Sequence, residues 1–224
     1  MRSPRTPRWF IVAALPLVAS GCALAEVGEG IGRVDGALFV RSCRDGKDLG
    51  APGAPAAYTM KPEFFVVDPV EDSVMDDHPV NRMQIRVQST GNLPEEADVL
   101  WITIADVRQV AESWNQIISV GATSNVRASL QLNRSCRDRE ATPSLQGQIV
   151  FATFGKADGS PPPEDFQVRF GEKIAAQFNF GVVDQRYELL AGQGGVPTTP
   201  AVAGHLDGDF EMKVVASRSA QAYP

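Results

Sequence analysis

The chain of 224 residues is poor in the residue types that most catalytic and metal sites need. It has two histidines, His78 and His205, so a Ser-His-Asp arrangement has few possible members, and we expect both to be ordinary surface residues. Neither has zinc-ligand spacing to a cysteine. No Gly-x-Ser-x-Gly elbow, His-Glu-x-x-His helix, phosphate loop or dinucleotide fingerprint occurs. These absences favour a non-enzymatic protein.

Positive charge and long apolar runs are also scarce. The formal net charge is −6, which argues against nucleic-acid binding, because phosphate contacts need a basic surface. The apolar run near the start covers Trp9 to Ala19. At about half of the roughly 20 residues that a transmembrane helix needs, this run is too short to span a bilayer stably.

The same run forms the centre of a secretory signal. Three arginines precede it with no acidic residue, and small residues follow it, a pattern typical of cleaved signals. The stretch Val18-Ala19-Ser20-Gly21-Cys22 resembles the lipobox of bacterial lipoproteins, with Ala19 where that family most often has Leu. The alternative is an ordinary cleaved signal that happens to be followed by a cysteine.

The lipobox resemblance implies a specific location. Residues 1–21 would be removed, and Cys22 would be diacylated on its thiol and acylated on its new amino terminus. Without the three arginines the formal charge falls from −6 to −9, so attachment to the membrane depends on the acyl chains, each buried methylene contributing about 0.8 kcal/mol. Ala23 follows Cys22, where enteric lipoproteins kept in the inner membrane have Asp. We therefore expect an outer-membrane lipoprotein.

The remaining cysteines, Cys43 and Cys136, form an even pair in an oxidising compartment, which predicts a disulfide. Closing a loop of this length stabilises the folded state by about 4–5 kcal/mol in the chain-entropy model. Two buried free thiols are the alternative.

Short strands separated by Gly, Pro and Asp turns predict an all-β fold, an antiparallel β-sandwich with one short helix at Asp106–Trp114. We expect a tether over residues 22–32 and a single domain over residues 33–224. The expected strands are Arg33–Arg41, Glu63–Val67, Asn81–Ser89, Val99–Ile104, Asn125–Asn133, Ile149–Phe154, Phe166–Phe170, Lys173–Val183 and Asp209–Val215.

The aromatic residues and long loops suggest where a partner binds. If Phe64 and Phe65 lie in a strand they point to opposite faces, so one of them is exposed as part of an interaction surface. Trp101 lies in the most apolar strand, and we expect it in the core. Three stretches are expected to be long loops, Gly46–Ala57, Gly155–Asp165 and Ala191–Gly204, and the last two are expected to carry binding residues.

Five carboxylates gather within ten residues, which is the pattern of either a calcium site or a solvated acidic loop. They do not follow EF-hand spacing. The calcium candidates are Asp68, Glu71, Asp72, Asp76 and Asp77.

The body of the chain resembles uncharacterised lipoproteins of large-genome gliding soil bacteria. The resemblance rests on the Cys43 corner, on Asn81–Val87, on the opening Gly-Arg-Val-Asp-Gly-Ala-Leu and on the closing Ala-Gln-Ala-Tyr-Pro. It implies no activity, no site and no substrate.

Together these features favour a lipid-anchored, non-enzymatic envelope protein that binds a protein or glycan partner. One alternative is an envelope polysaccharide hydrolase that uses paired carboxylates. Another is a structural linker between membrane and wall.

Overall fold

The computed structural model describes residues 26–70, 82–90, 93–136, 143–155, 172–184 and 202–217. In this part of the chain the protein is all-β, as the sequence predicts, with one short helix, α1 (Val107–Glu112), and one 3₁₀ turn, η1 (Pro94–Glu96). The strands are β1 (Glu26–Arg44), β2 (Lys47–Leu49), β3 (Ala56–Met60), β4 (Phe64–Val70), β5 (Arg82–Gln88), β6 (Asp98–Ile104), β7 (Ile117–Val120), β8 (Val126–Leu132), β9 (Ser144–Gly155), β10 (Lys173–Val183) and β11 (Val202–Ser217).

All these strands belong to one sheet that closes on itself. The pairing order is β11-β10-β9-β7-β8-β6-β5-β4-β1-β2, with β3 also paired to β1. The circuit closes because β1 pairs with β4 through Glu26–Gly28 and with β11 from Glu26 to Val40. Every pairing is antiparallel except the contact between β7 and β8. The all-β class is therefore confirmed, while the described strands form one continuous sheet and do not confirm a sandwich of two separate sheets.

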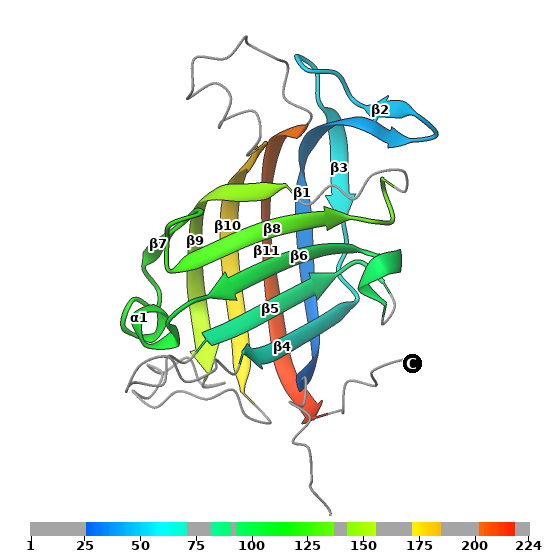
Figure 1. Ribbon diagram of the computed structural model, residues 1–224. Helices are drawn as coiled ribbons and strands as arrows, with labels where there is room; N and C mark the ends of the chain where they lie inside the picture. The colour runs from blue at the N-terminus through cyan, green and yellow to red at the C-terminus, as the bar shows by residue number, and fades with distance from the viewer. Residues whose placement is uncertain are drawn as a thin grey trace, which may run out of the picture.

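The closed sheet is flattened into two layers. Figure 1 shows β4, β5, β6 and β8 crossing in front of the long strands β1, β11, β10 and β9 at a large angle. Such crossing is typical of orthogonal packing, in which strands bend from one layer into the other. Each layer therefore has an inner face toward the core and an outer face away from it.

Glycines allow β1 and β11 to come together closely where they bend. A Cβ at Gly36 would overlap the carbonyl oxygen of His205, and a Cβ at Gly204 would overlap that of Ala37. Gly204 also has a φ of +153°, which side-chain-bearing residues rarely adopt. Glycine inside a strand commonly marks such a close approach or bend.

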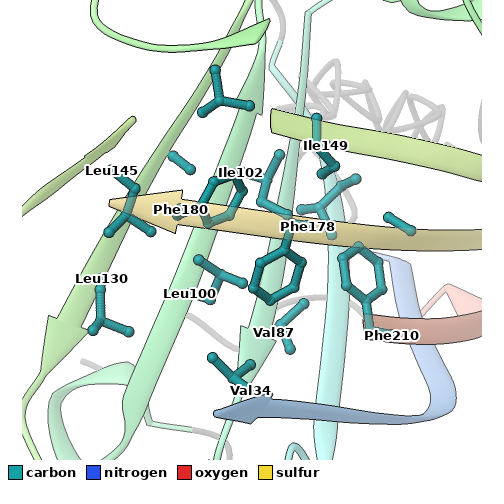
Figure 2. Packing of buried hydrophobic residues seen from close by; sticks show 14 of the residues in the cluster. Val34, Val87, Leu100, Ile102, Leu130, Leu145, Ile149, Phe178, Phe180 and Phe210 are labelled. Atoms are coloured by element: carbon teal, nitrogen blue, oxygen red, sulfur yellow. The ribbon is translucent and has the colours of Figure 1, made fainter. Parts of the chain in front are cut away.

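Side chains fill the space between the layers. Figure 2 shows Phe178, Phe180 and Phe210 of the rear layer facing apolar residues of the front layer, such as Leu100 and Ile102. The rings of Phe178 and Phe180 are stacked with centroids 4.7 Å apart. All these side chains are buried, so the sheet encloses a packed core.

Most expected elements are present, and β10 has the expected bounds. β1 differs, because it begins at Glu26 where a start at Arg33 was expected. Glycines at alternate positions, Gly28, Gly30 and Gly32, hide the strand alternation in this segment. Residues 26–32, which were expected to belong to the tether, are therefore part of the sheet. The loop expected over Gly46–Ala57 contains β2 and the start of β3. The strand expected at Phe166–Phe170 lies outside the described residues.

The helix is confirmed at the expected place. The Asp106 carboxylate accepts a hydrogen bond from the Arg108 backbone N–H at 2.9 Å and so caps α1. No helix in the described ranges is both long and apolar enough to cross a lipid bilayer.

Candidate functional site

The outer side of the front layer carries a group of aromatic, arginine and amide side chains, which we call the aromatic–arginine face. Its residues alternate with core residues along four neighbouring strands and stand in register across them. The face consists of Phe64, Val66 and Asp68 on β4, Gln84, Arg86 and Gln88 on β5, Val99, Trp101 and Thr103 on β6, and Arg127, Ser129 and Gln131 on β8. Of these, Val66, Gln88 and Val99 are fully buried, and the others are partly or fully exposed.

Arg86 lies at the centre of this face, between two aromatic rings. Its guanidinium carbon is 5.5 Å from the centroid of the Trp101 ring and 5.8 Å from that of Phe64. Both distances are within the range of a cation–π attraction. The Arg86 Nε is buried and has no hydrogen-bond partner among the described residues. The rings therefore hold this cation in place of hydrogen-bond acceptors.

Trp101 is fixed at both ends of its indole. Its Nε1–H donates to the Gln131 Oε1 at 3.2 Å, and Arg86 lies over the ring. The expectation that Trp101 lies in the core is wrong, because strand alternation points Leu100 and Ile102 inward and leaves Trp101 partly exposed outside. The sequence of β6 looks apolar on both faces. In the structure, one of these faces lies on the outer side of the sheet, beside polar side chains of β5 and β8.

The paired phenylalanines behave as expected. Phe65 is fully buried in the core and packs 6.5 Å from Phe210, measured between ring centroids. Phe64 is partly exposed on the outer side. The prediction that one of the pair contributes to an outer surface is confirmed.

Two ionisable side chains on this face, Asp68 and Arg86, are partly buried, and burial disfavours the charged form of each. Burial raises the pKa of Asp68, and the nearby Arg86 lowers it by less. Burial likewise lowers the pKa of Arg86, although Asp68 and Glu95 both raise it. Each charged form is thus less stable here than in water, and their mutual attraction does not fully compensate. Charges kept in such surroundings are more frequent at functional sites.

An open depression of about 200 Å³ adjoins the face on the side of β8. Its lining includes Thr103, Arg127 and Ser129 of the face, and it continues over Gly121 and Ser144. The Arg127 side chain is exposed and has no carboxylate partner among the described residues. The lining residues include no aspartate or glutamate, so the depression provides hydroxyls and one guanidinium.

The structure brings the predicted cysteine pair together. Cys43, at the end of β1, and Cys136, after β8, form a disulfide with Cα atoms 4.3 Å apart. It joins the end of β1 to the residues that follow β8, and we call this place the disulfide corner.

Beside the disulfide lies a buried carboxylate that no pattern in the sequence singles out. Asp98 is 3% exposed and accepts hydrogen bonds from the backbone N–H groups of Arg134 and Ser135, at 3.0 and 2.9 Å. The hydroxyls of Ser135 and Tyr58 also donate to it. These four hydrogen bonds join Asp98 to β3 and to the residues that precede Cys136, so Asp98 stabilises the disulfide corner and is structural.

The other candidate residues are mostly outside the described part. Of the calcium candidates only Asp68 is described, and it faces Arg86; Glu71, Asp72, Asp76 and Asp77 lie outside, as do Cys22 and His78. Within the described ranges no three His, Cys, Asp or Glu side chains converge as metal ligands. His205 is exposed on β11. The calcium site therefore stays a prediction. The loops expected over Gly155–Asp165 and Ala191–Gly204 are wrong at one end each, because Gly155 ends β9 and β11 begins at Val202; the rest of both loops lies outside the described residues and stays a prediction.

Comparison of the chain with protein families, with curated proteins and with solved structures finds no match.

Proposed function

We propose that this chain is a lipid-anchored, non-enzymatic protein of the bacterial outer membrane that binds a partner on the aromatic–arginine face. The observation that carries the proposal is Arg86, held between Phe64 and Trp101 on the outside of the sheet. Partly exposed Trp and Arg side chains are enriched where proteins bind partners. The core does not require them, since Leu100 and Ile102 already fill the inner side of β6.

The anchor is supported by the lipobox-like stretch that ends at Cys22. β1 begins at Glu26, so the segment between them has three residues and reaches about 10 Å when fully extended. Acyl chains on Cys22 would therefore hold the sheet next to the membrane surface. A partner would be another component of the envelope, either a glycan or a protein.

The anchor is tested separately from the binding face. Cells fed a clickable palmitate analogue should label the wild-type protein and not Cys22→Ser, which should move to the soluble fraction. Equal labelling of both forms, or a Cys22→Ser protein that remains in the membrane fraction, contradicts the lipid anchor.

The binding face is tested by photo-cross-linking in living cells. A photoreactive residue replaces Gln84 on the aromatic–arginine face or, as matched control, Gln177 on the outer face of β10. We expect one dominant cross-linked species from position 84, absent from position 177 and lost when Trp101→Ala is added. The same species from both positions, or no effect of Trp101→Ala, contradicts binding at this face.

The hydrolase alternative depends on two carboxylates that converge beside a substrate. The depression beside the face has none in its lining. Asp35 and Asp207 are in register on β1 and β11, but Asp35 is paired with Arg33 at 2.7 Å on the other outer face. The binding proposal is therefore preferred over hydrolysis and over a purely structural linker, which gives no reason for the aromatic–arginine face.

A further inference from the structure

Two neighbouring features of the face favour one class of ligand. The first is the partly exposed indole of Trp101. Arg86 occupies the ring face toward β5, and the residue in register with Trp101 on β8 is the small Ser129. The hydrogen bond to Gln131 fixes the ring in this position. The indole therefore lies in a fixed position, and its partner in register on β8 has little side-chain bulk.

The second feature is the depression on that side. Its lining includes Thr103, Ser129 and Arg127, and Arg127 has no carboxylate partner among the described residues. Arg127 is in register with Thr103, so it is the diagonal neighbour of Trp101, roughly 7–8 Å away between strands. At about 200 Å³ the depression is smaller than the roughly 300–1,000 Å³ of pockets that enclose a whole ligand. The depression therefore has room for one unit of a longer ligand, whose other units would lie along the surface.

We propose that this part of the face is a subsite for a sugar unit that bears a carboxylate, within a longer saccharide. The C–H face of the sugar stacks on the Trp101 indole, and its hydroxyls hydrogen-bond to Thr103 and Ser129. Its carboxylate pairs with Arg127, whose forked guanidinium suits two carboxylate oxygens. This inference rests on the proposed function and names the ligand class for the same face.

An acidic peptide is the competing occupant, and the strand pairing argues against it. Peptides that bind to sheets commonly add a strand at a free edge. β5 and β6 have partners along both sides, and the side of β8 away from β6 already pairs with β7 at Val126 and with β9 at Ala128 and Ser129, so the face presents no long free edge for such pairing. The lining provides hydroxyls and one guanidinium, and Ser129 in it is in register with Trp101, which together suit a ligand with polar groups around an apolar ring.

The test uses the mature chain with Cys22→Ser, which needs no detergent, and isothermal titration calorimetry. The probes are trimers of galacturonate, glucuronate and mannuronate, each with its methyl ester as the matched neutral ligand. We expect at least one acid trimer to bind at least tenfold more tightly than its ester, about the worth of one good charge-assisted contact. Raising the salt from 0.05 to 0.5 M, where screening is stronger, should weaken the acid and leave the ester unchanged.

Two variants assign the effect to residues. Arg127→Gln should bring the acid trimer down to the affinity of the ester, and Trp101→Ala should abolish binding of both. Arg108→Gln, an exposed arginine on α1, is the control and should change nothing.

The outcomes separate this inference from the proposed function. Equal binding of acid and ester, or an unchanged preference in Arg127→Gln, overturns the carboxylate subsite and leaves a neutral glycan as partner. Trp101-dependent binding of a tri-aspartate peptide, with no saccharide binding, overturns the sugar and favours a protein partner. Absence of binding to every trimer overturns the inference, while the cross-linking from position 84 decides the proposed function independently.

Discussion

The guanidinium of Arg86 and the indole of Trp101 lie 5.5 Å apart, on residues in register between β5 and β6. The pair is on the outside of a sheet whose inside is already filled, and Phe64 extends it on the other side of the cation. The fold therefore positions this pair precisely enough to be functional without depending on it for the core.

Replacing Arg86 with Leu should separate binding from stability. Two cation–π contacts of about 0.5–2 kcal/mol each are lost, but a cation with a buried, unpartnered Nε is also removed. We expect the free energy of unfolding to change by no more than about 1 kcal/mol, the tryptophan fluorescence to shift and the partner cross-link to disappear. Urea titration measures the first of these; a loss of about 3 kcal/mol or more would show that Arg86 is a structural ion. Arg108→Leu is the matched control.

Asp68→Asn should stabilise the protein at neutral pH. Burial raises the folded-state pKa of Asp68 above its ordinary 3.8, so the folded state favours the protonated form. The stability contributed by this group is complete below pH 3.8 and is lost as the pH rises through the folded pKa. Asparagine stays neutral and avoids that loss. Denaturant titrations should show a more stable variant at pH 7 and no difference near pH 3, with exposed Asp209→Asn unchanged at both.

Asp98 is expected to be the most sensitive position outside the apolar core. Asp98→Ala leaves the backbone N–H groups of Arg134 and Ser135 without their acceptor, which costs about 1–3 kcal/mol for each buried group. Asp98→Asn keeps one carbonyl oxygen for both N–H groups, and the hydroxyls of Ser135 and Tyr58 can rotate to accept from the amide. We therefore expect a loss of at least about 3 kcal/mol for Ala and about 1 kcal/mol for Asn. Equal losses in the two variants would contradict this role.

The raised pKa of Tyr58 predicts that the folded protein loses stability at alkaline pH. Burial first, then the charge of Asp98 and the hydrogen bond to it, raise the pKa of Tyr58 above its ordinary 10.0. A folded pKa above the unfolded one means that the contribution is complete below pH 10 and is lost as the pH rises beyond it. Tyr58→Phe removes the ionisable group. Its stability deficit against wild type at pH 8 should shrink at pH 11, and a constant deficit would contradict the assignment.

Removing the disulfide should destabilise the fold strongly. Cys43 and Cys136 are separated by 93 residues, for which the chain-entropy model gives about 4–5 kcal/mol. The double variant with alanine at both positions is compared with the oxidised wild type by urea titration. Reducing the wild type under the same conditions should give a similar loss, and a loss below about 1 kcal/mol would show that the fold itself already holds this corner.

The aromatic–arginine face shows which features strand alternation in the sequence predicts and which it does not. That Phe64 and Phe65 face opposite ways follows from strand alternation alone, and alternation also identified β5 and β8. Trp101 could not be placed in this way. In β6 both sides look apolar, and only the packing of neighbouring strands decides that Leu100 faces the core and Trp101 does not.

By itself the sequence determined the all-β class, most strands, the capped helix at Asp106 and the cysteine pair, because each depends on residue alternation, local capping or cysteine number. The tertiary structure alone decided that the sheet closes through β1 and β11, and that Arg86 meets Trp101 and Phe64. It also placed Asp98 beneath the disulfide corner. These relationships join residues that are distant along the chain, and strand register, which no local period encodes, brings them together.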